Sequence, residues 1–165
     1  LEIQPSKTQI FHFQKKSERV TCMQEFDGKI NHNSINRNFE YLGFSFDGET
    51  VSIKTSTLAK YYRKMKLAVR RGKYYSSVIN NKSRGQIFKR RLYKRYSHVG
   101  SLRAKKYKRV RGKTNEWRVS LKYNWGNFIT YAKLSAKTLD GNNVKNQIKN
   151  HWKNLNNEIR KNTNR

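Results

Sequence analysis

Lysine, arginine and the aromatic residues are the side chains of this sequence best suited to chemistry, and that chemistry is phosphate binding. The 165 residues contain 38 Lys and Arg against 10 Asp and Glu, a net charge of +28 at pH 7. Lys and Arg neutralise phosphates and release counterions, while Tyr and Trp can stack on bases or sugars. Because a merely solvated surface would carry both signs of charge, the excess favours a polyanionic ligand such as nucleic acid.

The candidate phosphate-binding residues lie on two expected helices and in a basic insertion at about 101–125. Aromatic residues are interleaved with them, but the helical spacing of Tyr61, Tyr62, Tyr96 and Trp152 favours the core for these four. We predict phosphate contacts from Lys60, Arg63, Lys64, Lys66, Arg70, Arg71, Lys89, Arg90, Arg91, Lys94, Arg95, Arg103, Lys105, Lys106, Lys108, Arg109 and Arg111.

The carboxylates show no pattern that would hold divalent metal ions. A two-metal nuclease or polymerase site needs closely placed carboxylates. The basic part of the chain has Glu116, Asp140 and Glu158 at unrelated places, and Asp47 and Glu49 lie beside a predicted turn that accounts for them. We therefore predict no metal site in this sequence.

The histidines and the single cysteine, Cys22, also lack the spacing of a metal site. We expect polar packing or phosphate-facing roles for His12, His32, His98 and His151. One cysteine cannot form an intrachain disulfide, which fits a reducing cytoplasm, and no apolar run is long enough to span a membrane. We expect a cytoplasmic protein without a membrane partner.

The charge divides the chain into two parts. Residues 1–49 hold six basic and seven acidic side chains, whereas the remaining residues hold 32 basic and three acidic ones. A nearly neutral part followed by a strongly basic part is typical of two functional regions. We place a β lobe at residues 1–54 and a basic helical domain at residues 55–165.

The first part is expected to form short antiparallel strands. β-Branched and aromatic residues cluster over residues 10–13 and 39–46. The second of these runs is followed by Asp47-Gly48 and by residues 50–54, which predicts a hairpin because both turn residues tolerate positive φ. We expect residues 14–38, which are polar and rich in Asn, to be an exposed connection with a strand near Lys29 to His32.

From residue 56 the apolar spacing becomes helical. Leu58, Met65 and Val69 share one face, and Gly72 is the expected end of this helix. The expected fold class is α+β, a small antiparallel β-hairpin lobe followed by a basic helical bundle. Beyond the first helix we expect a helix at about 85–98, a mobile basic loop at 100–113, a strand at 117–123, and helices at 128–139 and 142–159.

Several short motifs follow one another in a recognisable order. Leu1–Thr8 ends in Lys-Thr before a strand, Phe39–Phe46 contains Leu-Gly-Phe, and Ser56–Met65 begins a basic helix. In this order they resemble the stretch after the catalytic aspartates, the primer grip and the first thumb helix of bacterial reverse transcriptases. The likeness is greatest to the defence-associated reverse transcriptases that bacteria carry against phage, and residues 101–125 match least.

The resemblance implies roles for several residues. Lys7, which its place before a strand would by itself make a solvated edge residue, would lie near the incoming nucleotide as a proton donor to the leaving pyrophosphate. Tyr41, Leu42, Gly43 and Phe44 would form the primer grip, which sets the primer end. The basic helix that follows would line the thumb along the primer–template duplex, which is recognised by its shape and backbone.

The sequence departs from this family in containing no Tyr-x-Asp-Asp motif and no other paired aspartates. Without carboxylates for Mg²⁺ the chain should be inactive alone, so we expect Mg²⁺ and the rest of the reverse transcriptase polypeptide upstream of Leu1. The expected function is gripping of RNA and RNA/DNA duplexes in antiphage RNA-directed DNA synthesis, with a noncoding RNA as a further partner. The alternatives are a non-catalytic RNA-binding scaffold protein and a basic ribosomal-type protein.

Overall fold

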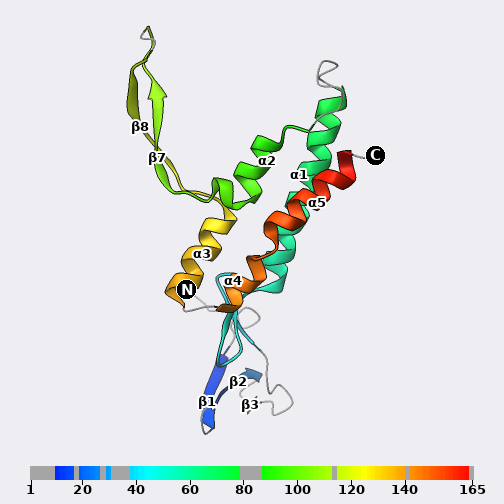
Figure 1. Ribbon diagram of the computed structural model, residues 1–165. Coiled ribbons are helices and arrows are strands. Elements are labelled where there is room, and N and C mark those ends of the chain that lie inside the picture. Colours follow the sequence, from blue (N-terminus) through cyan, green and yellow to red (C-terminus); the bar gives the residue numbers. More distant parts are fainter. Residues whose placement is uncertain are drawn as a thin grey trace, which may run out of the picture. The chain divides into compact units, whose positions relative to one another are not determined.

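The computed structural model describes residues 10–16, 19–26, 29–30, 38–78, 87–112, 115–139 and 142–163 of the chain (Figure 1). Helices and antiparallel strands are both present, so the predicted α+β fold class is confirmed. The chain forms two compact units, Leu1–Thr57 and Leu58–Arg165. Their division lies close to the boundary that the charge distribution indicates.

The first sheet of the N-terminal unit contains β1 (Ile10–Lys16), β2 (Arg19–Phe26) and β3 (Lys29–Ile30), in that order and antiparallel. β1 begins in the predicted strand and continues past it. β2 occupies residues that we expected to be an exposed connection, so that prediction is wrong there, whereas β3 begins at Lys29, where a strand was expected. The reason is that β2 buries Cys22 and the polar Gln24, which no apolar alternation reveals.

A second antiparallel sheet contains β4 (Phe39–Tyr41), β5 (Phe44–Phe46) and β6 (Val51–Ile53). Residues 39–46 are therefore a hairpin and not the single strand predicted. Leu42 and Gly43 both adopt positive φ (47° and 87°), as a two-residue hairpin turn requires. The chain reverses at this dipeptide and again before β6.

The second reversal is the predicted Asp47-Gly48 turn, which is confirmed. The Asp47 carboxylate accepts hydrogen bonds from the backbone N–H groups of Glu49 and Thr50 at 2.9 and 2.7 Å. Gly48 lies against β2 so closely that an added Cβ would collide with the carbonyl oxygen of Val20. A side chain is therefore excluded at Gly48, and the turn packs on the first sheet.

The long helix α1 (Thr55–Val78) continues past its expected end at Gly72. Tyr61, Met65 and Val69 are buried, as their spacing predicts. Gly72 does not stop the helix. An added Cβ there would lie 3.4 Å from the Ile87 side chain, an ordinary van der Waals distance, so the packing does not require a glycine at this position.

Helix α2 (Lys89–Tyr96) and helix α3 (Phe128–Thr138) pack around Tyr61 of α1, and a short 3-10 turn η4 (His98–Gly100) follows α2. The Tyr61 ring stacks on Phe128 with a centroid separation of 4.3 Å. Asn127 caps α3 by accepting from the N–H of Ile129 at 2.9 Å, and its amide donates to the carbonyl of Ser97 at 2.8 Å. The cap thus fixes α3 to the end of α2.

The expected helix at 142–159 is instead two helices, α4 (Asn142–Ile148) and α5 (His151–Thr163). The apolar stripe runs through both, since Val144, Ile148 and Leu155 are buried. At the junction the His151 Nδ1 bonds to the carbonyl oxygen of Ile148 at 2.6 Å. This bond occupies the last carbonyl of α4, where a continuous helix would need a backbone donor.

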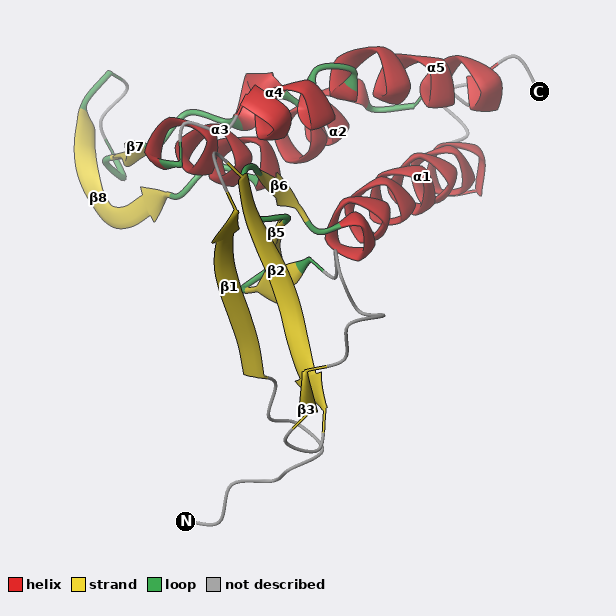
Figure 2. Cartoon of the chain, turned by 90° about the horizontal axis from the view of Figure 1, so that it is seen from below, coloured by secondary structure: helices red, strands yellow, loops and turns green. Residues whose placement is uncertain are grey.

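The expected basic loop is an ordered hairpin of β7 (Ala104–Arg109) and β8 (Trp117–Asn124), antiparallel and forming a two-stranded sheet of its own (Figure 2). The prediction of a loop is wrong for Ala104–Arg109, which form β7, whereas β8 lies where a strand was predicted. The sequence of β7 is rich in Lys and shows no alternation of apolar and polar residues, because its residues are exposed on both faces.

Candidate nucleic-acid interface

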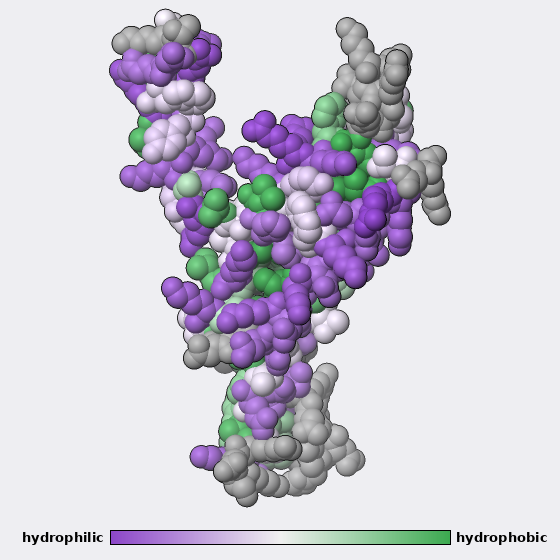
Figure 3. Space-filling model, viewed as in Figure 1, coloured by the Kyte–Doolittle hydropathy of each residue, from purple (hydrophilic) through white to green (hydrophobic). Residues whose placement is uncertain are grey.

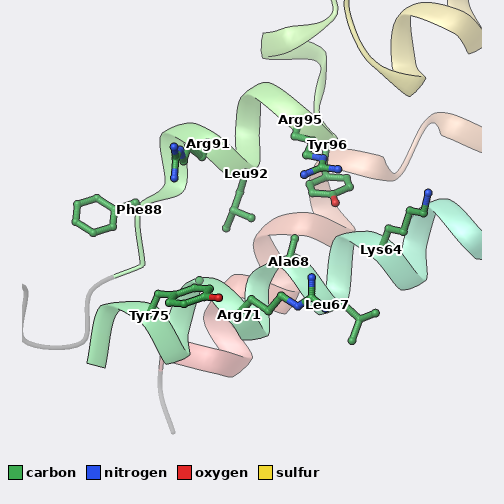
Figure 4. Close-up of a pocket in the computed structure, with 11 residues that line it drawn as sticks. Lys64, Leu67, Ala68, Arg71, Tyr75, Phe88, Arg91, Leu92, Arg95 and Tyr96 are labelled. Carbon is green, nitrogen blue, oxygen red and sulfur yellow. The ribbon is translucent and has the colours of Figure 1, made fainter. Parts of the chain in front are cut away.

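A groove of about 530 Å³ separates α1 from α2 and carries four cations (Figure 4). Lys64 and Arg71 come from α1, and Arg91 and Arg95 come from α2. We call this feature the α1–α2 groove. Among the described residues that line it, none is acidic.

The two helices position these cations by their spacing. Lys64 and Arg71 are seven residues apart, and Arg91 and Arg95 are four apart, so each pair lies on one helix face. Leu92 and Tyr96, on the adjoining side of α2, are buried and hold that helix in place. The groove is therefore a built arrangement of charge rather than a chance cluster of surface lysines and arginines.

Aromatic and apolar side chains complete the α1–α2 groove. Tyr75 and Phe88 lie at its border with exposed fractions of 54% and 61%, and Leu67 and Ala68 also line it. The Arg95 guanidinium lies over the ring of Tyr96, 5.6 Å from its centroid. This stacking orients a planar donor that can bind phosphate oxygens bidentately.

The electrostatics of the groove favour an anionic ligand. All four cationic side chains belong to exposed residues, and hydrophilic residues cover much of the visible surface of the helical unit (Figure 3). Like charges facing one another across a groove repel, and a phosphate backbone placed between them removes that repulsion. Binding would also release condensed counterions from the nucleic acid.

A second groove of about 390 Å³ lies between α1 and α5 and has mixed charge. Lys66 and Lys161 line it together with Glu158, Asn154 and Asn157. Lys66, which the sequence grouped with the other cations of α1, therefore faces a carboxylate-bearing helix. A phosphate would be attracted less strongly there than in the α1–α2 groove.

The remaining predicted cations of the helices belong to neither groove lining. They are exposed, which suits long-range attraction of a polyanion more than a defined contact. The structure thus divides the predicted set instead of gathering it into one surface. These residues are Lys60, Arg63, Arg70, Lys89, Arg90 and Lys94.

The predicted cations of the basic insertion lie on and beside the β7–β8 hairpin. Arg103 stacks over Trp125, with 5.0 Å to the ring centroid. Sequence reasoning missed the aromatic residues Tyr107 and Trp117 and the cation Arg118 as candidates, although the alternation of residues 117–123 was a signal for them. On or next to β7 are Lys105, Lys106, Lys108, Arg109 and Arg111.

The proposed primer-grip residues form the turn between β4 and β5. Tyr41 and Leu42 are 63% and 76% exposed, although both are large and apolar in part. The carbonyl of Gly43 accepts from the backbone N–H of Lys54 at 2.9 Å, and Lys54 also pairs with Glu40. These contacts hold the turn in place while it presents two bulky side chains to solvent. Lys7, the proposed proton donor, lies outside the described residues.

Burial shifts the pKa of several groups in this chain. Desolvation lowers the pKa of His151, the charges of His98 and Lys133 act in the same direction, and the hydrogen bond to the carbonyl of Ile148 opposes them. Desolvation raises the pKa of Tyr61, and the neighbouring Tyr62 and Tyr96 add to that shift. Both residues support the fold, and the cations carry the candidate binding chemistry.

Within the described parts of the chain, no three His, Cys, Asp or Glu side chains gather closely enough to hold a metal ion. The helices that the structure describes include none long and apolar enough to cross a membrane. No protein-family model matches the chain, and no curated protein is similar to it in sequence. The α1–α2 groove and the Leu42–Gly43 turn are the two features of this chain that bear on its function.

Proposed function

We propose that this chain binds nucleic-acid duplexes through their phosphate backbone, as the primer grip and thumb of an RNA-directed DNA polymerase. The observation that carries the proposal is the α1–α2 groove, where Lys64, Arg71, Arg91 and Arg95 face one space with no acidic residue in its described lining. Contacts of this kind go to the backbone and carry no sequence information. A thumb that holds any primer–template needs that property.

The preferred ligand under this proposal is an RNA/DNA hybrid or another A-form-like duplex. Proteins recognise A-form helices by shape, by phosphates and by 2′-hydroxyl groups across the wide minor groove. Arginine forks and a lysine along one groove supply backbone contacts without base readout. The duplex is therefore expected to be bound irrespective of its sequence.

The Leu42–Gly43 turn supports the polymerase part of the proposal. A positive φ at an exposed leucine is costly and persists where surrounding structure imposes it, which is frequent at binding sites. The resemblance to bacterial reverse transcriptases assigns this turn to the primer end. It also assigns Lys7 to proton donation, and it places Mg²⁺ and its carboxylates in polypeptide outside this sequence, in a cytoplasmic antiphage system.

A non-catalytic RNA-binding scaffold is the second candidate, and the absence of paired aspartates from the sequence favours it. The two candidates differ in ligand preference. A scaffold for a noncoding RNA should prefer folded RNA over an RNA/DNA hybrid. A thumb should bind the hybrid at least as well as RNA of the same length.

The test is a binding titration of the chain against blunt RNA/DNA hybrid, RNA duplex, DNA duplex and a folded RNA hairpin at several salt concentrations. We expect log K to fall linearly with log salt with a slope of about −3.6, since about four phosphates would be neutralised in the groove at about 0.9 each. We expect the hybrid to bind more tightly than the DNA duplex. Salt-independent binding would overturn the backbone grip, and a strong preference for folded RNA would favour the scaffold.

A further inference from the structure

The β7–β8 hairpin has two chemically different faces near its tip. The strand register places Tyr107 opposite Val119 and Arg109 opposite Trp117. Directly opposite residues lie on the same side of a sheet, and residues two apart on a strand share a side. Tyr107, Arg109, Trp117 and Val119 therefore form one face, which we call the ring face, while Lys108 and Arg118 pair on the other.

The apolar side chains of the ring face are open to solvent. Tyr107, Trp117 and Val119 are 63%, 61% and 54% exposed. Among the residues that the structure describes, no ring contacts Tyr107 or Trp117. Clustered exposed apolar groups mark binding surfaces.

Aromatic residues at the base of the hairpin behave differently. Tyr123 and Trp125 contact each other with centroids 4.8 Å apart, and Arg103 covers Trp125. The contrast shows that the rings at the base are used within the fold. The rings of the ring face remain available to a ligand.

The root of the hairpin is held by defined hydrogen bonds. The Asn124 amide donates to the carbonyl of Leu102 at 2.8 Å, and the Thr130 hydroxyl of α3 donates to the carbonyl of Ser101 at 2.6 Å. Gly126, at φ 81°, lies so close to Thr130 that an added Cβ would collide with it. A fixed root sets the direction of the arm and lowers the ordering cost of binding.

Charge identifies the ligand that fits this face. Residues 101–125 contain nine basic residues and one acidic residue, Glu116. The Glu116 Oε1 atom lies 3.5 Å from Nη2 of Arg118. A second copy of this chain would bring like charges together, and an apolar protein groove would have to desolvate them. Nucleic acid supplies negative phosphates and flat bases at once.

We propose that the ring face stacks on unpaired bases, so that the β7–β8 hairpin binds a single-stranded segment of RNA or DNA. The inference rests on the proposed function in taking nucleic acid as the ligand. Bases inside a duplex already stack on each other, so Tyr107 and Trp117 can reach the faces of unpaired bases. Arg109 on the same face supplies a phosphate contact, and Lys108 and Arg118 on the other face add positive charge that attracts any nucleic acid.

The experiment compares blunt hybrid with the same hybrid carrying a single-stranded tail of roughly ten nucleotides, made as RNA or as DNA. Binding to each probe is measured by anisotropy for the chain and for the double variant Tyr107→Leu, Trp117→Leu. The change to leucine keeps apolar bulk and removes the aromatic faces. Two further variants serve as controls: Trp117→Phe keeps a ring, and Lys108→Ala removes a charge from the other face.

We expect the unchanged chain to bind the tailed probes more tightly than the blunt one. The double variant should lose affinity for both tailed probes by about 5- to 100-fold and keep its affinity for the blunt hybrid. Trp117→Phe should retain most of the tail preference, and Lys108→Ala should weaken both kinds of probe together. Circular dichroism of each variant shows whether the chain is still folded.

Three results of the binding titrations would overturn the inference. These are an unchanged tail preference in the double variant, an equal loss on blunt and tailed probes, or a wild-type chain that ignores the tail. A change in oligomeric mass in the double variant would assign the ring face to a second copy instead. Failure of the wild-type chain to bind blunt hybrid would overturn the proposed duplex grip alone, because tail binding is scored separately.

Discussion

The hydroxyl of Tyr61 on α1 donates a hydrogen bond of 2.7 Å to the carbonyl oxygen of Tyr96, the last residue of α2. The same ring stacks on Phe128 at the start of α3. One side chain therefore joins three helices beside the α1–α2 groove. The bond also satisfies a carbonyl at the C-terminal end of α2, where no intrahelical donor is present.

Tyr61→Phe should keep the ring contacts and remove this bond. Because the hydroxyl is buried and the carbonyl would lose its partner, we expect the free energy of unfolding to fall by about 1–2 kcal/mol. Urea denaturation followed by circular dichroism measures this change. Tyr74→Phe, on the exposed side of the same helix, is the matched control and should change stability little. Equal stability of both variants would show that the Tyr61 bond contributes nothing.

Arg91→Ala and Arg95→Ala should each weaken binding of duplexes of any sequence to a similar extent. Loss of one charged hydrogen-bonding group costs roughly ten-fold in affinity at low salt, and the slope of log K against log salt should become shallower by about 0.9. Titrations at several salt concentrations with two unrelated sequences measure both effects.

Two lysines serve as controls for the groove arginines. Lys145→Ala, on α4 and outside both grooves, removes the same charge and should alter binding much less. Lys66→Ala should give an intermediate loss, because Lys66 shares its groove with Glu158. A loss confined to one nucleic-acid sequence would contradict backbone gripping.

Acid should destabilise the helical unit through His151. The backbone N–H of His98 donates to Nε2 of His151 at 3.2 Å, so Nδ1 carries the proton that is donated to the carbonyl of Ile148. Protonation of Nε2 would place two donors face to face, and burial further lowers the pKa of His151. His98 and Lys133 are the charged or titratable neighbours that act in the same direction.

A histidine whose pKa is lower in the folded state contributes stability that is fully present above its unfolded pKa of about 6.5. That stability is lost as the pH falls through the folded pKa. We therefore expect the free energy of unfolding to decrease between about pH 7 and pH 5, and His151→Asn to flatten this dependence. Denaturation of both proteins across this range is the measurement, and parallel curves would assign the dependence to other groups.

Leu42→Asn should stabilise the chain and weaken duplex binding. Leucine is disfavoured at the positive φ that the turn requires, whereas asparagine tolerates it, so we expect a gain of about 1 kcal/mol. If Leu42 contacts the primer end, the affinity of the variant for RNA/DNA hybrid should fall despite its gain in stability. Leu42→Ala is the control, since it removes the side chain with less relief of strain. A variant that binds hybrid as well as the original chain would remove Leu42 from the proposed grip.

The sequence by itself determined most of the helices and the sign of the charge that the chain carries. Apolar spacing located α1, α2 and α3, because a helix that buries one face has apolar residues at every third or fourth position. The Asp47-Gly48 turn was predictable because its chemistry is local. The charge excess after residue 49 is a sum over residues and needs no structure.

The sequence did not reveal some strands and one helix break, because the periodic pattern of apolar residues does not mark them. β2 buries Cys22 and Gln24, and β7 is exposed on both faces, so neither shows the alternation that marks a half-buried strand. The break between α4 and α5 depends on a side-chain bond from His151 to Ile148, which the apolar stripe passes over unchanged.

Tertiary structure decided which cations act together. Lys64 and Lys66 are only two residues apart, yet one lines the α1–α2 groove and the other lines a groove with Glu158, because helix residues two apart point about 200° from each other. Arg91 and Arg95 meet Arg71 because the Tyr61–Tyr96 bond and the buried Leu92 place α2 beside α1. Composition determines how much positive charge a chain carries, and packing of the helices determines which of the cationic side chains line the same groove.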